Sequence, residues 1–208
     1  MTADQVMEEI LRDRMFYETS NGGVTLSGGE PVLQRKFAKE MLERCKNEDL
    51  HTAIETCGNY HWQELESLLP VTDLIMMDLK LVDPIRHQQA CGQSNDRIMA
   101  NARRLALTDK PVIFRTPIVP TVNDTLQDVG AIVKFIRNLV ELRIKHNNGK
   151  GKETEIQFEL LPFHRLGSDK YRSLGMEYHA RGLEPPTKEK MQELAEIAKI
   201  EGVEVLVR

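Results

Sequence analysis

Short apolar runs alternate with helix-patterned segments along almost the whole chain, and this alternation limits the fold more than any other feature. The runs that read as strands lie at residues 23–27, 52–56, 74–80, 112–116, 156–161 and 203–207. The helical patterns lie at residues 2–15, 31–45, 62–69, 84–107 and 125–145, and from 187 onward. Near-continuous apolar strands separated by helices form parallel sheets that helices cover. The sequence therefore predicts a single α/β domain over residues 1–208.

Several local signals predict where these elements begin and end. Thr2 and Gln5 have capping-box spacing, and the helix that they open carries an apolar stripe as far as Met15. Gly92 is expected to break the helical stretch 84–107, and Pro117 to stop the fourth strand. We expect a surface loop at 146–155, an irregular stretch at 162–186 and a helix cap at Thr187. The expected apolar face of the second helix consists of Leu33, Phe37, Met41, Leu42 and Cys45.

Composition excludes several classes of protein. The 208 residues are 40% hydrophobic and 29% charged with a net charge of −4, which is typical of globular proteins and disfavours a nucleic-acid partner. No apolar stretch approaches the ~20 residues of a membrane helix, and the amino terminus lacks the order of a signal peptide. The three cysteines are unevenly spaced and odd in number. We therefore expect a reducing, cytoplasmic location rather than a disulfide framework or a membrane.

The turn Ser27-Gly28-Gly29-Glu30-Pro31 follows the first strand and opens the next helical pattern. Two glycines at the carboxyl end of a strand let the backbone approach a ligand closely. The acid that follows adds negative charge, so the turn suits a small cationic group such as an ammonium. A tight turn without a ligand has the same residues, and both interpretations stay open on this turn alone.

Charged residues end several of the other strands, where parallel α/β folds bind their ligands. They are Glu55, Asp78 with Lys80, Arg115 and His164. Asp78 and Lys80 lie two residues apart on a strand, so we expect both to point to one face, with Met77 and Leu79 on the other. Such a pair is either an internal ion pair or the recognition site for a free amino acid. In the second case the lysine binds the carboxylate, and the acids and the glycine carbonyls bind the ammonium.

The chain resembles a known family over essentially its whole length. The motifs are Phe16-Tyr17, Gly22 to Pro31, Glu55 to Gly58, Asp73 to Lys80, Arg115 to Pro120, Asn123-Asp124, Leu160 to Gly167, Lys170-Tyr171 and Glu184 to Thr187. They occur in the order and spacing of the glycyl-radical-enzyme activating enzymes of the radical S-adenosylmethionine (SAM) superfamily, which include the pyruvate formate-lyase activating enzymes. The resemblance implies a partial TIM-like barrel of parallel strands.

The resemblance also assigns roles to individual residues. It implies that Gly28, Gly29 and Glu30 hold the amino group of SAM and that Lys80 takes its carboxylate. Glu55 and Asp78 add acidic contacts to the amino end. His164 lies beside the ribose and adenine. The resemblance further implies that Arg115, Asn123 and Asp124 meet the incoming substrate. It gives no catalytic side chain and no metal ligand in this chain.

The activity that the resemblance implies uses a 4Fe–4S cluster, which cleaves SAM with one electron. The resulting 5′-deoxyadenosyl radical removes a hydrogen from a glycine of a partner such as pyruvate formate-lyase, in anaerobic metabolism. A flavodoxin or ferredoxin is the implied electron donor. The family binds its cluster through Cys-x-x-x-Cys-x-x-Cys upstream of the glycine turn, and this sequence has no such motif. We therefore expect a chain that matches the family without its cluster-binding part and first strand, and that is inactive by itself.

Two other functions remain open from the residues. A barrel lyase could use Lys80 as a Schiff-base nucleophile with Asp78 tuning it. A cluster-free module could bind SAM, or dock on the partner enzyme, without performing chemistry.

Overall fold

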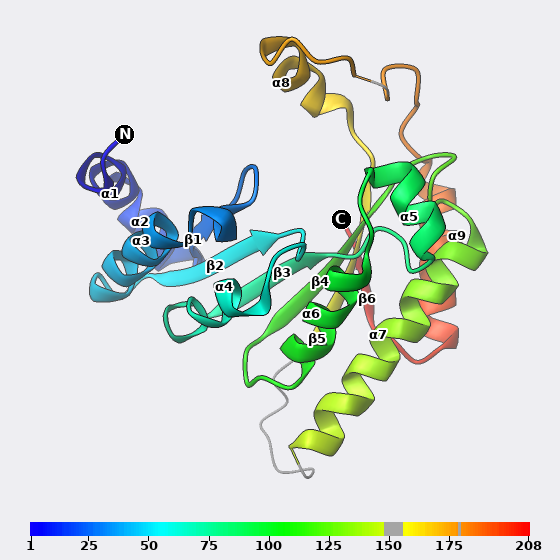
Figure 1. Cartoon of the computed structure of the whole chain (residues 1–208), viewed down its shortest axis with the longest axis horizontal. Helices are drawn as coiled ribbons and strands as arrows, with labels where there is room; N and C mark the ends of the chain where they lie inside the picture. Colours follow the sequence, from blue (N-terminus) through cyan, green and yellow to red (C-terminus); the bar gives the residue numbers. More distant parts are fainter. Residues whose placement is uncertain (148–155, 179) are drawn as a thin grey trace. The chain divides into compact units, whose positions relative to one another are not determined.

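The computed structural model describes residues 1–147, 156–178 and 180–208 (Figure 1). Its strands join one sheet in the order β1-β2-β3-β4-β5-β6, and the pairs β1–β2, β2–β3 and β5–β6 are parallel. The strands are β1 (Gly23–Leu26), β2 (His51–Thr56), β3 (Leu74–Asp78), β4 (Val112–Ile118), β5 (Ile156–Pro162) and β6 (Val205–Val207). All six predicted strands are confirmed. The structure divides into two compact units, so the prediction of a single domain stays a prediction.

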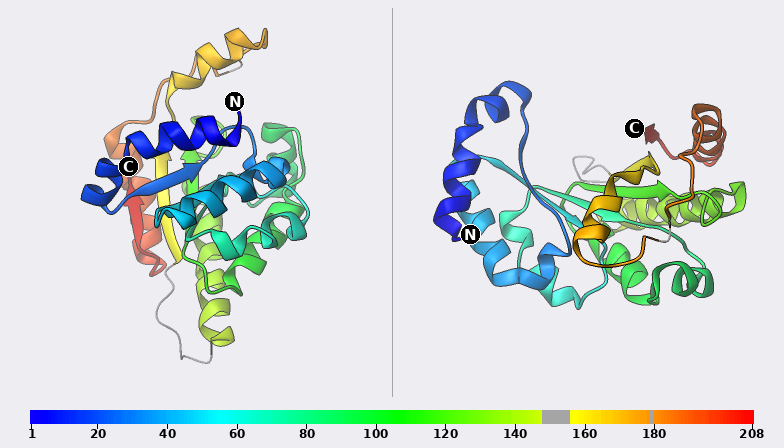
Figure 2. Two further views of the ribbon diagram at one scale, coloured as in Figure 1. Left: turned by 90° about the vertical axis from the view of Figure 1, so that its left-hand side faces the viewer. Right: turned by 90° about the horizontal axis from the view of Figure 1, so that it is seen from above.

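Unit 1 contains residues 1–78, 96–113 and 142–147, together with Ile156. Its helices are α1 (Ala3–Arg12), α2 (Arg14–Ser20), η1 (Pro31–Gln34), α3 (Arg35–Asn47), α4 (Trp62–Glu66), η2 (Leu69–Val71) and α6 (Asp96–Ala106). Helices α1 and α3 pack beside β1 (Figure 2). Their shared core contains Met7 of α1, Val24 of β1, and Met41 and Cys45 of α3. One face of the first strands is thereby covered by helices.

Two predictions about the helices of unit 1 are wrong in detail. The capping box of Thr2 and Gln5 is present, but the helix ends at Arg12, and Met15 lies on α2 with its side chain exposed. The second helix begins with the 3₁₀ turn η1, which has about three residues per turn rather than 3.6. The tighter turn changes which side chains face the core. Val32 is therefore buried, whereas Leu33 and Phe37 are exposed and line an open surface groove.

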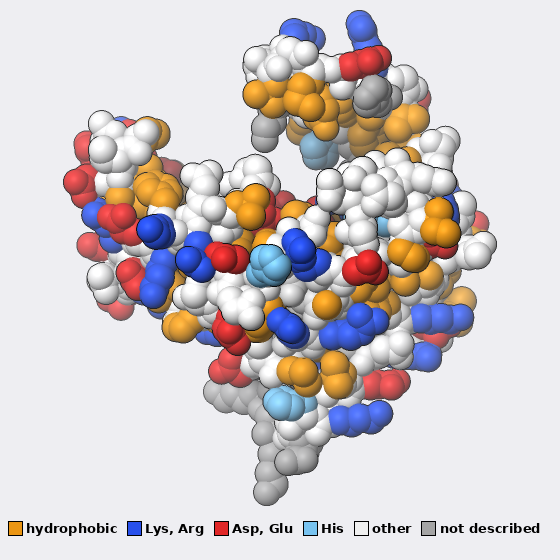
Figure 3. Space-filling view, in the orientation of Figure 1, with side chains coloured by type: hydrophobic (Ala, Val, Ile, Leu, Met, Phe, Trp, Pro, Cys, Tyr) orange, Lys and Arg blue, Asp and Glu red, His pale blue; other side chains and the backbone are white. Residues whose placement is uncertain are grey.

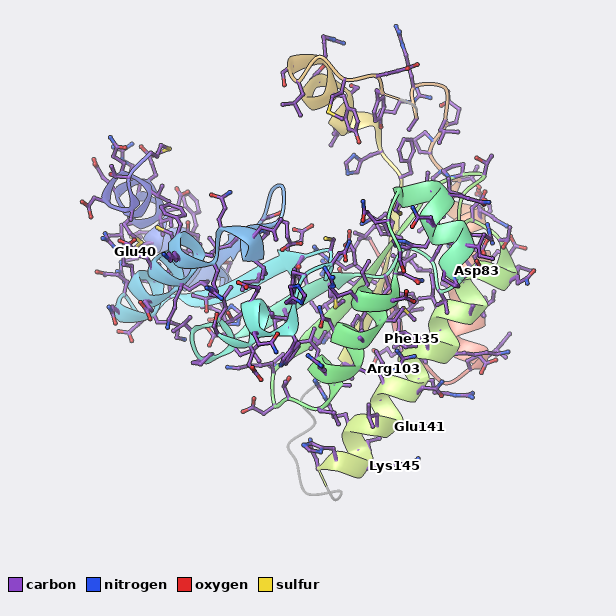
Figure 4. All side chains as sticks on the ribbon, in the orientation of Figure 1. Glu40, Asp83, Arg103, Phe135, Glu141 and Lys145 are labelled. Atoms are coloured by element: carbon purple, nitrogen blue, oxygen red, sulfur yellow. The ribbon has the colours of Figure 1, made fainter. Side chains whose placement is uncertain are left out.

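Unit 2 contains residues 79–95, 114–141 and 157–208. Its helices are α5 (Pro84–Cys91), α7 (Leu126–His146, whose last residues belong to unit 1), η3 (Arg165–Gly167), α8 (Ser168–Ser173) and α9 (Lys188–Ile200). Asp83, labelled in Figure 4, caps α5 by accepting the Arg86 N–H. The predicted break at Gly92 is the left-handed end of that helix. Thr187 caps α9, as predicted.

The fourth strand continues through Pro117 to Ile118, so the predicted stop is wrong. The Arg115 carbonyl accepts the Leu79 N–H just beyond the end of β3. Pro117 lies two residues further along that edge, where the strand no longer needs an N–H donor. The third strand is shorter than predicted, because it ends at Asp78 and not at Lys80.

The stretch 162–186 is not wholly irregular, since it carries η3 and the short helix α8. Leu166, Leu174 and Met176 expose apolar side chains on this segment (Figure 3). Most of the loop predicted at 146–155 lies outside the described residues. In the part of the chain that the structure describes, none of the helices is long and apolar enough to span a membrane.

Candidate functional site

The carboxyl ends of β1, β2 and β3 place two carboxylates on the face of the sheet opposite the helices. Glu55 pairs in register with Met76, and Asp78 follows two residues later, so both acids point to the same face. Thr56 and Met77 point to the other face and are buried. Ser27, just past β1, donates a hydrogen bond of 3.1 Å to Glu55 Oε2. Unit 1 therefore carries a short acidic row, half-buried, at the predicted end of the sheet.

The turn between β1 and η1 is open at both of its glycines. Gly28 has φ +82° and Gly29 has φ +52°, values that favour glycine. A Cβ atom added to either residue would meet nothing within 4 Å. Their backbone can therefore be approached closely from outside, as the sequence predicted.

Glu30 turns into the protein rather than toward this open space. Its carboxylate accepts hydrogen bonds from the Val32 N–H (3.2 Å), the Cys57 N–H (2.9 Å) and the Thr56 hydroxyl (2.9 Å). These bonds join the glycine turn to the end of β2. An amino group bound by Glu30 would therefore have to share carboxylate oxygens that already accept hydrogen bonds from the protein.

In unit 2, the turn after β4 is built around Asn123, which is 1% exposed. Its Oδ1 accepts the Val119 N–H (2.7 Å), while its Nδ2 donates to the carbonyls of Pro117 and Lys80 (2.9 Å each). Asp124 accepts the Thr121 N–H at 3.0 Å. The Asn123 amide is thus engaged inside the turn, where it fixes the backbone of Lys80 instead of lying on the surface for a substrate.

Arg115 lies in an ion-paired cluster that the sequence did not predict. Its Nε donates to Glu159 Oε2 at 3.0 Å, and Arg208 donates to Glu159 Oε1 at 2.6 and 3.0 Å. Glu159 is fully buried, so its charge needs these two guanidinium groups. An acid in the middle of the apolar run Ile156 to Leu161 was the signal that could have revealed it.

His164 is exposed and is the N-cap of η3, where its Nδ1 accepts the Leu166 N–H at 3.3 Å. Gly28, Gly29, Glu30, Glu55 and Asp78 lie in unit 1. Lys80, Arg115, Asn123, Asp124 and His164 lie in unit 2. The boundary between the units falls directly after Asp78, and the pairing of Asp78 with Lys80 stays a prediction.

Comparison with known proteins decides the family. A family model for the radical SAM superfamily matches residues 1–136, well over half of the chain. The chain belongs to that superfamily. It is 34% identical over 208 residues to the pyruvate formate-lyase 1-activating enzyme of Escherichia coli (strain K12), covering 99% of this chain and 79% of the relative. It is also 34% identical over 210 residues to the (2S)-3-sulfopropanediol dehydratase activating enzyme of Klebsiella oxytoca.

Within the superfamily, these relatives place the chain among the glycyl-radical-enzyme activating enzymes. All of this chain aligns with the Klebsiella relative, and it spans only 63% of the length of that protein. A solved domain of pyruvate-formate lyase-activating enzyme from Bacteroides vulgatus ATCC 8482 matches with a TM-score of 0.69 and 26% identity, covering 90% of this chain and 99% of that one. The predicted α/β fold of the partial radical SAM type is confirmed.

The residues of this radical SAM chain do not fit a 4Fe–4S cluster. Such clusters are held by cysteine thiolates. Cys45 is buried in the core of unit 1, Cys57 is half-buried and Cys91 is exposed. Among the described residues, no group of three or more His, Cys, Asp or Glu side chains could hold a metal ion. The cysteines of this chain therefore do not provide the ligands that a 4Fe–4S cluster needs.

The residues of unit 1 do fit the amino-acid end of SAM. The two open glycines offer bare backbone, and the acidic row of Glu55 and Asp78 offers negative charge on the face that the helices leave free. An ammonium group is stabilised by carboxylates and carbonyl oxygens, which are the groups present here.

Proposed function

We propose that this chain forms the SAM-binding part of an enzyme that activates a glycyl radical enzyme. The observation that supports this proposal most is the glycine turn of Gly28 and Gly29. A Cβ atom at either glycine would meet nothing within 4 Å, and the turn follows Ser27, which is bonded to Glu55 of the acidic row. Open space beside a glycine is also found at the helix end Gly92, but a purely structural turn does not need the acids beside it. Membership of the radical SAM superfamily supports SAM as the ligand.

Each candidate residue has a proposed role in holding SAM. Gly28, Gly29 and the carboxylates of Glu55 and Asp78 hold the ammonium, and Glu30 supports them from within the turn. Lys80 takes the carboxylate of SAM. Its backbone carbonyl is fixed by Asn123 at 2.9 Å, which limits where the side chain can start. His164 lies beside the ribose and adenine.

SAM supplies the hydrogen-abstracting radical when it is cleaved by one electron, and the hydrogen comes from a glycine of the partner enzyme. For the partner, we propose a pyruvate formate-lyase-like glycyl radical enzyme, because the relatives' names point to that class. Arg115 and the turn of Asn123 and Asp124 are the proposed substrate-facing positions. For Arg115 the contribution is limited by its ion pair with Glu159.

The electron donor that we propose is a flavodoxin or a ferredoxin. We place the reaction in an anaerobic cytoplasm. Cys45, Cys57 and Cys91 form no disulfide, which supports a reducing compartment because disulfides are rare there. The cluster that delivers the electron needs ligands beyond those that the described residues provide.

Calorimetric titration with three adenosine compounds tests the proposed ligand. SAM is expected to bind, because the chain carries the contacts for its amino-acid end. Adenosine, which lacks that end, is expected to bind at least ~10-fold more weakly, the effect of losing one charged hydrogen bond. ATP is expected not to bind, because its phosphates would face the acids of Glu55 and Asp78. Equal affinity for adenosine and SAM would contradict recognition of the amino-acid end.

A surface-binding measurement tests the proposed partner. Purified pyruvate formate-lyase is passed over the immobilised chain, and binding is expected to weaken when Asp124→Ala alters the exposed turn after β4. Asp169→Ala is the control, since Asp169 is an exposed acid on α8 that has no proposed contact. Binding that is the same for all three chains would contradict the assignment of that turn.

A further inference from the structure

The Glu30 carboxylate is held by a chain of hydrogen bonds within unit 1 that reaches from the glycine turn to α6. The first link is the Thr56 hydroxyl, which lies 2.9 Å from both carboxylate oxygens. The Cys57 N–H, at 2.9 Å, binds one oxygen, and the Val32 N–H, at 3.2 Å, binds the other. A carboxylate with three donors has few acceptor positions left. Glu30 is therefore committed to holding the turn.

Thr56 uses its full hydrogen-bonding capacity in this chain. A hydroxyl has one proton to donate and two lone pairs that accept. The proton goes to the Glu30 carboxylate, the acceptor that carries a charge. One lone pair accepts the Gly58 N–H at 3.1 Å. The remaining close neighbour is the Tyr60 hydroxyl, also at 3.1 Å, so Tyr60 must donate to Thr56.

Tyr60 is well suited to that donor role. Its side chain is 2% exposed, and burial raises the pKa of its hydroxyl far above the ordinary value, so the proton stays on the oxygen. The direction of the hydrogen bonds is then fixed from Tyr60 through Thr56 to Glu30.

The backbone around Tyr60 is fixed in turn by α6. Asn101, 2% exposed, donates from Nδ2 to the carbonyls of Gly58 and Tyr60, both at 2.9 Å. Gly58 has φ +74°, and a Cβ there would lie 2.2 Å from Met77 Cε, so the loop packs directly on β3. Tyr60 therefore has a single position from which to donate.

We infer that Thr56 and Tyr60 are positioning residues of the SAM site, which act by holding Glu30 so that the glycine turn is formed before the ligand arrives. The inference rests on the proposed function for its ligand. Neither residue needs to touch SAM. Thr56 points to the helix-covered face, away from Glu55 and Asp78, and both Thr56 and Tyr60 are buried.

The physical reason is that an open turn with two positive-φ glycines has little to hold it in place. Glycine loses more backbone entropy on ordering than any other residue. Among the described residues other than the chain neighbours, nothing lies within 4 Å of either glycine's Cβ position. The flanking side chains attach the turn to the rest of unit 1: Ser27 makes one hydrogen bond, to Glu55, whereas Glu30 accepts bonds from Thr56 and Cys57 as well as from Val32. Glu30 makes more of these bonds, so its attachment contributes most to the order of the turn.

The test compares two buried threonines of unit 1. Thr56→Val removes the hydroxyl that binds Glu30. Thr72→Val removes a hydroxyl that is equally buried but donates to the Leu68 carbonyl, with no link to the turn. Amide hydrogen exchange in the ligand-free protein is followed at Cys57, whose N–H binds Glu30. Thr56→Val is expected to speed Cys57 exchange at least ~10-fold relative to Thr72→Val, as expected for loss of a hydrogen bond to a charged group. An unchanged Cys57 rate would overturn the inference.

The second readout is the affinity for SAM. It is expected to fall at least ~10-fold in Thr56→Val and by a smaller factor in Tyr60→Phe, to recover in Thr56→Ser, and to stay unchanged in Thr72→Val. Equal affinity of the Thr56→Val and Thr72→Val variants would also overturn the inference, since a merely structural threonine would behave in that way. If the unmodified chain does not bind SAM, the proposed function fails, while Cys57 exchange still decides whether Thr56 holds Glu30.

Discussion

Gly58 and Gly92 share a left-handed backbone but differ in their surroundings. Gly58 has φ +74° and Gly92 has φ +70°, and any L-residue at such angles costs ~1–2 kcal/mol. A Cβ at Gly58 would collide with Met77 Cε at 2.2 Å, whereas nothing lies within 4 Å of the same position at Gly92. The two glycines thus separate backbone strain from steric exclusion.

We predict that Gly58→Ala lowers the free energy of unfolding by ~1 kcal/mol more than Gly92→Ala does, because Met77 Cε, the end of a flexible but fully buried side chain, must move aside. Urea denaturation of the two variants measures the difference. Equal losses would mean that the Met77 side chain moves aside at no cost.

At the residue level, the sequence predicted the acids but not their partners. Glu55 and Asp78 could be found because they end apolar strands, and strand ends meet at one edge of a parallel sheet. The inward turn of Glu30 depends on Thr56 and Cys57, 26 and 27 residues further along the chain, and on the local 3₁₀ geometry. A pattern in the sequence does not reveal hydrogen bonds of this kind, which form only when β1 and β2 are in register.

At the level of elements, Asp73 ties together the starts of β2 and β3 and the end of α3. It accepts hydrogen bonds from the Thr52 N–H (2.8 Å) and the Thr52 hydroxyl (3.1 Å), and it pairs with Lys46 at 3.0 Å. Partial burial raises the pKa of the Asp73 carboxyl, but the bonds from Thr52 and the pairing with Lys46 together lower it below its ordinary value.

The sign of the pH effect follows from that lowered pKa. The stabilisation by Asp73 is present above the ordinary carboxyl pKa and is lost as the pH falls through the folded value. We predict that Asp73→Asn flattens the fall in thermal midpoint between neutral pH and about pH 3. Glu8→Gln, an exposed acid on α1, is the control and should keep the wild-type slope. A slope unchanged in Asp73→Asn would contradict the assignment.

Helix α1 is attached to unit 1 through a small core with α3 and β1. Met7 is 8% exposed and its sulfur lies 4.0 Å from Cys45 Sγ. We predict that Met7→Ala destabilises the protein by ~2–3 kcal/mol, because it removes a buried side chain and leaves a cavity. Glu8→Ala, on the exposed face of the same helix, should change stability by less than ~0.5 kcal/mol. Faster amide exchange along α1 in Met7→Ala alone would show that this core holds the helix.

Element type was largely predictable from hydrophobic period, whereas boundaries and phase were not. The six strands and the helices α5, α7 and α9 follow from apolar patterns and caps. The 3₁₀ turn at Pro31 shifted the buried face to Val32, and the continuation of β4 through Pro117 depended on where β3 ended. Both outcomes depend on neighbouring elements in space, which a local pattern does not contain.

At the level of the whole molecule, the chain combines the proposed SAM site with the absence of a cluster site among its described residues. We predict that anaerobic reconstitution with iron and sulfide leaves this chain without a stoichiometric 4Fe–4S cluster, because thiolates at a workable spacing are lacking. Iron and acid-labile sulfide per chain are measured after desalting. A stable cluster that is lost on substitution of Cys45, Cys57 or Cys91 would contradict this prediction, because it would show that these thiols bind iron together.

In the function proposed for this chain, the acidic row of unit 1 recognises the ammonium of SAM. The most direct measurement is a calorimetric titration of SAM into the unmodified chain, Asp78→Asn and Asp83→Asn. The two variants carry the same chemical change, but Asp83 caps α5 and asparagine caps a helix equally well. We predict that Asp78→Asn weakens binding by ~1.5–3 kcal/mol, the range for a hydrogen bond to a charged group, while Asp83→Asn binds SAM as the unmodified chain does. Equal affinity of all three proteins for SAM would contradict it.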